Sequence, residues 1–240
     1  SQSQVEEFIF HEKPDVVINC AAKTNLEYCE ENKIESFKSN TAGVINLIDS
    51  CARSNVKLVH ISSGCLFDGN SFIACEETVT TPGVWYTWTK NWADEIIQNY
   101  GYENYLILRP RQLISKVAHP TNMLTKFSKM KTIPAICEPN SITCIEDLRE
   151  MIDHLLYVDA KGIYNCANEG SVTPYEIATG VKKFINQNIA VTKIKYQELL
   201  EILPNRRVNT LLDIRKLKST GYDPRSATNA LKWCLINYEK

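Results

Sequence analysis

The chain has 240 residues, a formal net charge of −1 and hydrophobic residues at 44% of its positions. This length suits one α/β domain, or a nucleotide domain with a smaller partner, and the balanced charge argues against a nucleic-acid surface. No apolar run approaches the roughly 20 residues of a membrane-spanning helix, and we see no signal-peptide pattern. We therefore expect neither a nucleic-acid partner nor a membrane.

The nine cysteines bear on the cellular compartment. An odd number excludes a complete disulfide framework, and none of them shows the C-x-x-C spacing of zinc sites. We expect free thiols in a reducing compartment, which predicts a cytoplasmic protein. His60 alternates within an apolar run and is expected to be a satisfied core histidine, and no metal site is predicted.

The first half of the chain alternates between strands and helices. Apolar runs typical of buried parallel strands cover residues 15–19, 57–61 and 105–108. A short helix is expected over 1–10, a longer one over 34–54, and a third begins at Tyr86. A turn is expected over 67–70. This order predicts a right-handed parallel sheet.

The second half has a different pattern. Helices are expected over residues 123–130, 145–158, 173–186, 213–219 and 226–238, and short strands over 141–144, 163–166 and 190–196. Thr173 and Glu176 form a capping box with Pro174 at the first helical position. We predict a Rossmann-like α/β core over 1–112 and a small, mainly substrate-binding α/β part over 113–240, with 162–168 returning to the main sheet.

Reactive side chains follow the second predicted strand and open the next helix. A tyrosine and a lysine four residues apart on a helix point the same way. Ligands bind at the carboxyl ends of strands in open α/β sheets. One small site is therefore predicted to hold Ser63, Cys65, Tyr86 and Lys90.

These residue types suit the reduction of a ketone. A phenol is a poor acid or base at neutral pH, and a neighbouring ammonium such as that of Lys90 favours its ionisation. A serine hydroxyl can align a carbonyl, and the phenol can protonate its oxygen while a nicotinamide delivers hydride. The alternative for Tyr86 and Lys90 is a helix-surface pair, because Tyr-x-x-x-Lys often arises by chance.

In these motifs the chain resembles the extended short-chain dehydrogenase/reductases over its whole length. The segments that carry the resemblance are 19–22, 40–43, 62–69, 86–90 and 108–110. The resemblance implies a reductase triad of Ser63, Tyr86 and Lys90, with NADP (or NAD) as cofactor. The residues that it implies for cofactor binding are Asn19, Cys20, Ala21, Ala22, Asn40, Tyr86, Lys90 and Arg109.

Within that family, the chain is most similar to the bifunctional nucleotide-sugar 3,5-epimerase/4-reductases of rhamnose synthesis, and it is also similar to dTDP-4-dehydrorhamnose reductases and GDP-fucose synthases. The simple reductases usually carry tyrosine at the position of Cys65. The resemblance implies Cys65 as an epimerase acid, Lys126 as its base partner, and Asn122 and Arg207 as substrate contacts. The expected reaction is epimerisation at C3 and C5 of a nucleotide-linked 4-keto-6-deoxyhexose, followed by reduction at C4.

Simpler alternatives stand beside these assignments. Considered without its neighbours in the sequence, Cys65 is expected to be a buried thiol. Lys126 is then expected to be a solvated helix lysine, and Arg206–Arg207 an exposed basic pair. Trp88 and Trp92 are expected in the core or at a dimer surface. The alternative activity is a simple 4-reductase without epimerisation, and the alternative class is a catalytically inactive regulatory or binding subunit.

The family's nucleotide-binding unit begins with a strand, a glycine-rich turn and a helix whose N-terminus receives the pyrophosphate. The first glycine of this chain is Gly43, so we expect an N-terminally incomplete sheet whose strand 15–19 is an open edge. Three explanations remain: the segment is missing only from this sequence, another chain supplies it, or the cofactor site has been lost. The resemblance implies a homodimer.

Overall fold

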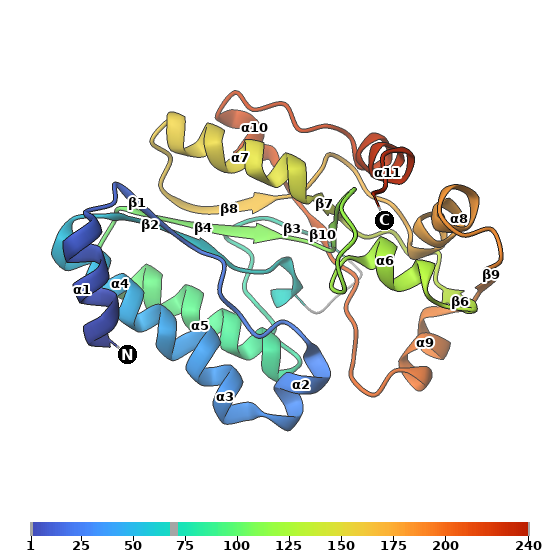
Figure 1. Ribbon diagram of the computed structural model, residues 1–240, viewed down its shortest axis with the longest axis horizontal. Coiled ribbons are helices and arrows are strands. Elements are labelled where there is room, and N and C mark those ends of the chain that lie inside the picture. The colour runs from blue at the N-terminus through green and yellow to red at the C-terminus, as the bar shows by residue number, and fades with distance from the viewer. Residues whose placement is uncertain (1, 68–71, 240) are drawn as a thin grey trace. The chain divides into compact units, whose positions relative to one another are not determined.

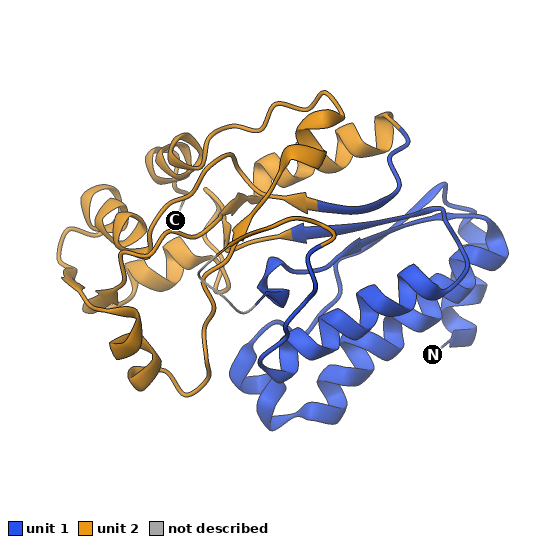
Figure 2. Ribbon diagram, turned by 180° about the vertical axis from the view of Figure 1, so that it is seen from behind, with its two compact units in different colours: residues 1–68, 78–109, 159–164 blue, residues 69–77, 110–158, 165–240 orange. Residues whose placement is uncertain are grey.

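The computed structural model describes residues 2–67 and 72–239 (Figure 1). They form two compact units, the first made of residues 1–68, 78–109 and 159–164, and the second of 69–77, 110–158 and 165–240 (Figure 2). Most of the turn predicted over 67–70 lies outside the described residues. Among the helices of these residues, none combines the length and the apolar composition that a bilayer crossing requires.

The first unit is a parallel sheet with helices on it. Its elements are α1 (Gln2–Glu12), β1 (Val16–Asn19), α2 (Leu26–Glu31), α3 (Lys33–Phe37), η1 (Lys38–Ala42), α4 (Gly43–Ser54), β2 (Lys57–Ile61), η2 (Gly64–Leu66), α5 (Trp85–Asn99) and β4 (Tyr105–Pro110). β1 pairs in parallel with β2, and β2 with β4. With β8 (Gly162–Cys166) the strand order is β1-β2-β4-β8, which confirms the predicted α/β class with a parallel sheet.

Helical spacing of apolar residues explains the packing of α4. Val44, Ile48 and Cys51 lie on one face of this helix and are fully buried against a cluster that includes Leu58 of β2 and Ile107 of β4. Burying such side chains stabilises a fold by about 1.5–3 kcal/mol each. α1, α4 and α5 lie on the same face of the strands β1, β2 and β4 (Figure 1), so the site residues on α5 have a rigid support.

The helix predicted over 34–54 is divided. α3 ends at Phe37, a π-helical turn, η1, covers Lys38–Ala42, and α4 continues from Gly43. π turns are rare and often mark functional sites. Here the turn contains Asn40 and Thr41, whose buried side chains bind groups outside the helix, so the interruption places two polar side chains against α5.

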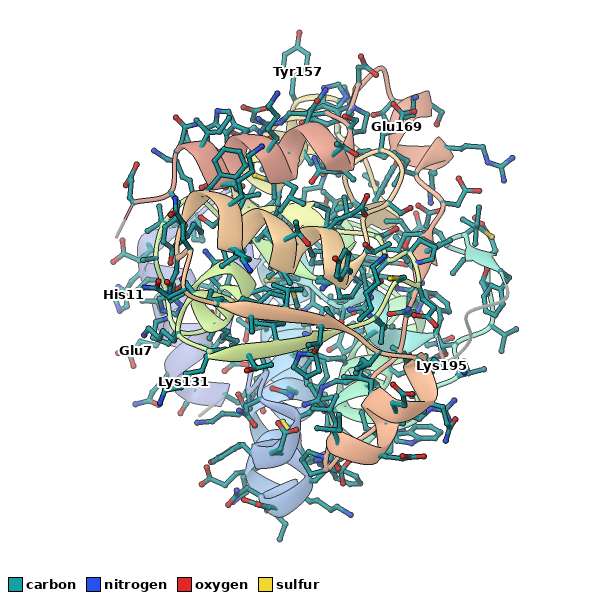
Figure 3. All side chains as sticks on the ribbon, turned by 90° about the vertical axis from the view of Figure 1, so that its right-hand side faces the viewer. Glu7, His11, Lys131, Tyr157, Glu169 and Lys195 are labelled. Atoms are coloured by element: carbon teal, nitrogen blue, oxygen red, sulfur yellow. The ribbon has the colours of Figure 1, made fainter. Side chains whose placement is uncertain are left out.

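The second unit is built from short strand pairs and helices. Its elements are β3 (Ile73–Ala74), β5 (Leu113–Ile114), α6 (Met123–Ser128), β6 (Thr132–Ala135), β7 (Thr143–Cys144), α7 (Ile145–Tyr157), α8 (Pro174–Phe184), β9 (Ala190–Lys193), α9 (Tyr196–Ile202), β10 (Leu211–Leu212), α10 (Arg215–Ser219) and α11 (Ala227–Ile236). The parallel pairs are β3–β10, β5–β7 and β6–β9. Figure 3 shows Lys131 and Lys195 at opposite ends of the β6–β9 pair.

Two strand predictions in the second unit are too long. The strand predicted over 190–196 ends at Lys193, because α9 begins at Tyr196. The Glu198 carboxylate accepts the Lys195 N–H at 3.1 Å, a hydrogen bond that caps the start of a helix. The strand predicted over 141–144 is reduced to β7, since the Ser141 N–H donates to the Thr210 carbonyl at 3.0 Å instead of extending the β5–β7 ladder.

Candidate active site

Lys90 is fixed at the end of β2. Its Nζ donates to the Ile61 carbonyl oxygen at 2.8 Å and lies 3.1 Å from His60 Nε2. The residue is 1% exposed, and burial lowers the pKa of Lys90 to about 8. The amine is therefore still mainly protonated at neutral pH. This contact holds α5 against the carboxyl end of β2, where Ser63 follows.

Tyr86 lies one helical turn before Lys90 and is also buried, at 8% exposure. Two residues outside α5 form hydrogen bonds with the start of this helix. The Glu30 carboxylate accepts the Trp85 N–H at 2.6 Å, and Trp85 Nε1 donates to Ser36 Oγ at 3.0 Å. Because both members of the Tyr-x-x-x-Lys motif are buried, the helix-surface alternative is wrong.

Ser63 and Cys65 belong to the turn that follows β2. Ser63 is extended, and its Oγ accepts the Cys65 N–H at 3.1 Å, which starts η2. Cys65 is half-buried, whereas five other cysteines are fully buried. Because α5 packs against η2, the predicted residues Ser63, Cys65, Tyr86 and Lys90 come from two adjoining elements of one unit.

His60 links two predicted site residues. It is fully buried, with Nε2 beside the Lys90 amine and Nδ1 at 3.0 Å from Asn19 Nδ2. Burial, with the charge of Lys90 acting in the same direction, lowers the pKa of His60 well below its usual value, so the ring is neutral. The sequence indicated a core histidine, but strand alternation could not show that its partners are site residues.

Asn40 fastens the loop after β1 to α5. Its Oδ1 accepts the Lys23 N–H at 2.7 Å, and its Nδ2 donates to the Lys23 carbonyl at 2.9 Å and to Thr89 Oγ1 at 3.0 Å. Both amide hydrogens are thus bound within the protein. Cys20 and Ala21 of this loop are exposed and Ala22 is half-buried. Direct cofactor contact by Asn40 stays a prediction.

Arg109, at the end of β4, is 3% exposed. Its Nε donates to Asp94 Oδ2 of α5 at 3.1 Å, and its guanidinium lies 5.7 Å from the centre of the Phe67 ring. Removing one partner of such a buried ion pair is strongly destabilising, because the other charge is left uncompensated. Arg109 therefore joins β4 to α5, and its predicted contact with the cofactor stays a prediction.

The residues predicted to act on the substrate from the second unit have different surroundings. Asn122 caps α6 by accepting the Leu124 N–H on its Oδ1 at 3.1 Å. Lys126, on the same helix, is exposed. Arg207 is half-buried, and its guanidinium donates to the Asn205 carbonyl at 3.0 Å. The alternatives of a solvated Lys126 and a basic pair at Arg206–Arg207 therefore stay open.

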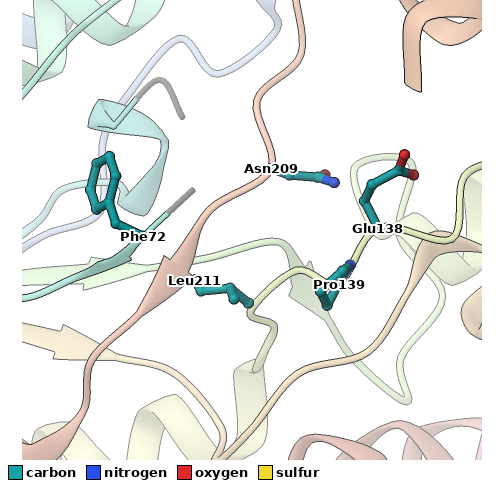
Figure 4. A pocket seen from close by; sticks show the side chains of 5 residues that line it. All are labelled: Phe72, Glu138, Pro139, Asn209 and Leu211. Carbon is teal, nitrogen blue, oxygen red and sulfur yellow. The ribbon is translucent and has the colours of Figure 1, made fainter. Parts of the chain in front are cut away.

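A cavity of about 70 Å³ also lies in the second unit (Figure 4). Its lining residues are Phe72, Glu138, Pro139, Asn209 and Leu211. Within the described part of the chain, Asn209 Nδ2 and Glu138 Oε2 are buried without a hydrogen-bond partner. Such groups are usually satisfied by water or by a polar ligand. From the sequence, substrate contact was assigned to the nearby Arg207 and to neither of these two residues.

A parallel α/β sheet, a serine after a strand end and a buried Tyr-x-x-x-Lys on the following helix are together typical of the short-chain dehydrogenase/reductases. The model of the family described as RmlD substrate binding domain matches residues 1–240. The chain belongs to this family.

Relatives with known names support this assignment. A bifunctional dTDP-4-dehydrorhamnose 3,5-epimerase/dTDP-4-dehydrorhamnose reductase of Arabidopsis thaliana is 30% identical over 86% of this chain and 71% of its own length. The crystal structure of the L780 UDP-rhamnose synthase from Acanthamoeba polyphaga mimivirus has a TM-score of 0.88 and 25% identity, and the match covers 99% of this chain and 87% of that one.

A second solved structure resembles this chain in fold. It is a dTDP-4-dehydrorhamnose reductase from Bacillus anthracis in complex with NADP, with a TM-score of 0.87 and 22% identity, covering 100% of this chain and 86% of that one. The chain is also 28–30% identical to trifunctional UDP-glucose 4,6-dehydratase/UDP-4-keto-6-deoxy-D-glucose 3,5-epimerase/UDP-4-keto-L-rhamnose-reductases of Arabidopsis thaliana. It spans about a third (32%) of their length.

The buried amine of Lys90 predicts a particular dependence of stability on pH. Its pKa of about 8 in the folded protein lies below the ordinary lysine value of about 10.4. Between these values the unfolded chain binds more protons at this site, so the free energy of unfolding should rise with pH across that window. Lys90→Met should lose this rise, as measured by denaturant unfolding at several pH values. Lys126→Met, at an exposed lysine, should keep it. A rise that persists in Lys90→Met would contradict the assignment.

Proposed function

We propose that this protein catalyses the NAD(P)H-dependent reduction of C4 in a nucleotide-linked 4-keto-6-deoxyhexose. The observation that supports the proposal is the Lys90 amine bound to the Ile61 carbonyl, because Lys90 lies one turn after Tyr86 on α5 and Ile61 lies two residues before Ser63. The names of the relatives, a bifunctional dTDP-4-dehydrorhamnose epimerase/reductase and a UDP-rhamnose synthase, support this substrate class.

In this proposal each residue has a defined role. The Ser63 oxygen already accepts the Cys65 N–H, so its own hydrogen is left for the ketone oxygen. The Tyr86 hydroxyl gives that oxygen a proton, and the Lys90 ammonium favours the loss of this proton from the phenol. Because the pKa of Lys90 is about 8, the rate should fall as the pH rises above that value.

The residues present fit the reactive end of a nicotinamide cofactor. Lys90 and Tyr86 supply an ammonium and a phenol, and Cys20 and Ala21 are exposed in the loop after β1. When bound, the cofactor would supply the hydride. Asn19 holds this loop in place, because its Oδ1 accepts the Ala21 N–H at 3.1 Å.

We further propose that the protein epimerises C3 and C5, with Cys65 as the acid and Lys126 as the base. The hydrogens on these carbons are acidic because they flank the 4-ketone, and Ser63 and Tyr86 would stabilise the enolate. The bifunctional Arabidopsis relative and the half-buried thiol at position 65 support this step. A thiol can act as an acid near neutral pH when its surroundings tune it.

We also propose that the protein is a cytoplasmic homodimer. All nine cysteines are free, as expected of a reducing compartment. On α5, Trp88 is 41% exposed and its ring centre lies 5.8 Å from that of Trp92, which forms an apolar surface suited to a second copy. The alternative that another chain completes the sheet beside β1 stays a prediction.

Tyr86→Phe removes only the proposed proton donor. We expect the turnover of a UDP- or dTDP-linked 4-keto-6-deoxyglucose with NADPH to fall by about 10²- to 10⁴-fold. NADPH affinity, measured by fluorescence titration, should change little. Tyr102→Phe is the matched control, because the Tyr102 hydroxyl binds the Val56 carbonyl at 3.0 Å and should not matter for turnover. Wild-type turnover by Tyr86→Phe would place the donor elsewhere. Absence of NADPH binding by the intact natural protein would favour a non-catalytic subunit.

Cys65→Ala tests the epimerase proposal separately. In deuterium oxide the wild-type protein should incorporate solvent deuterium at C3 and C5, detected by NMR of the sugar. The variant should lose this incorporation, whereas Cys75→Ala, at another half-buried thiol, should retain it. Unchanged incorporation in Cys65→Ala would contradict the role of this thiol. Reduction by the wild-type protein without any incorporation would identify a simple 4-reductase.

A further inference from the structure

Two cysteines and a glutamate converge in the core of the second unit. Cys144 ends β7, Glu146 lies in the first turn of α7, and Cys234 lies on α11. The two sulfur atoms are 3.5 Å apart, and Glu146 Oε2 is 3.0 Å from the sulfur of Cys144. The three atoms lie within 4.8 Å of one another, and neither thiol has exposed surface.

This spacing is close to that of ligands on a tetrahedral zinc ion. With Zn–S bonds of about 2.3 Å and tetrahedral angles, two thiolate sulfurs lie about 3.8 Å apart. A disulfide would require the sulfurs to approach to about 2.05 Å. The two sulfur atoms of Cys144 and Cys234 are 3.5 Å apart. They would therefore move much less to bind one cation together than to form a disulfide bond.

Two hydrogen bonds to its other carboxylate oxygen orient Glu146. Its Oε1 accepts from Ser115 Oγ at 2.8 Å and from the Lys116 N–H at 3.1 Å, which leaves Oε2 directed at the thiols. Metal-binding carboxylates are commonly held in this way by hydrogen bonds from outside the ligand set. Among the described residues, no lysine, arginine or histidine forms an ion pair with Glu146. The donors around it are a thiol, a hydroxyl and an amide.

The local charges also suit a divalent cation. Arg225 Nε donates to Asp147 Oδ2 at 3.2 Å, and its guanidinium approaches the sulfur of Cys144 at 4.0 Å. With neutral thiols, the charges of Glu146, Asp147 and Arg225 leave one net negative charge. A divalent cation that displaces the two thiol protons to solvent leaves this net charge unchanged. Binding therefore adds no uncompensated charge to a buried site.

We propose that Cys144, Cys234 and Glu146 bind one thiophilic divalent cation of the zinc type. The thiolates and one carboxylate oxygen are the protein ligands, and water completes the tetrahedron. The ion would join α11 to β7 and to the start of α7, so its role is to stabilise the second unit. Sequence spacing could not predict the site, because the two cysteines are 90 positions apart.

Cobalt absorption tests the proposal directly. The reduced, metal-free chain should bind one equivalent of Co²⁺ with a thiolate-to-cobalt charge-transfer band and the visible bands of tetrahedral cobalt. Cys144→Ala and Cys234→Ala should lose these bands. Cys51→Ala, at another fully buried cysteine in the first unit, should keep them. Ser115→Ala should weaken binding about 10- to 100-fold, because it releases Oε1 of Glu146.

A stability measurement guards against variants that fail to fold. Zn²⁺ should raise the unfolding temperature of the wild-type chain and of Cys51→Ala, and should raise it much less in Glu146→Gln, which keeps the size of the side chain. The absence of charge-transfer bands in the reduced wild-type chain would overturn the proposal. So would bands that persist in a Cys144→Ala/Cys234→Ala double variant, because other thiols would then be the ligands.

Discussion

The hydrogen bond from the Lys90 amine to the Ile61 carbonyl is the interaction on which the candidate active site depends. Removing an ammonium from water is costly, and the low pKa of Lys90, about 8, reflects that cost. The contacts with Ile61 and His60 offset part of it. The contacts place a charged group at the end of β2, close in sequence to Ser63, which is proposed to polarise a ketone. A helix shifted by one residue would place neither Lys90 nor Tyr86 there.

The surrounding polar contacts reinforce this placement. Asn40 ties the loop after β1 to Thr89 of α5, and Arg109 ties β4 to Asp94 on the same helix. Both residues were predicted to touch the cofactor, and the structure shows both bound within the protein. Family motifs can thus reflect residues that hold an active site together as well as residues that contact a ligand.

Much of the fold could be predicted from the sequence because its signals are local. The apolar run of residues 57–61 coincides with β2, and the capping box at Thr173 and Glu176 does start a helix. The π turn at Lys38–Ala42 and the roles of His60 and Asn40 could not be predicted. They depend on side-chain bonds between segments far apart in the chain, which leave no periodic pattern.

In the second unit, fewer of the candidate site residues could be predicted from the sequence. Asn122, Lys126 and Arg207 were named from resemblance, whereas the unpartnered groups of Asn209 and Glu138 became visible only when the chain was folded. The cysteines offer a similar lesson. Spacing along the chain argued against a metal site, yet the fold brings Cys144 and Cys234 together from positions 90 residues apart.

The most direct test of the central claim follows a label from NADPH carrying deuterium at the transferable position of its nicotinamide. The wild-type chain, given a nucleotide-linked 4-keto-6-deoxyglucose, should yield a sugar with one deuterium at C4, measured by NMR and mass spectrometry. A folded Lys90→Met variant should transfer little of it. The account would be contradicted if the wild-type product carried no label at C4, or if Lys90→Met transferred the label at the wild-type rate.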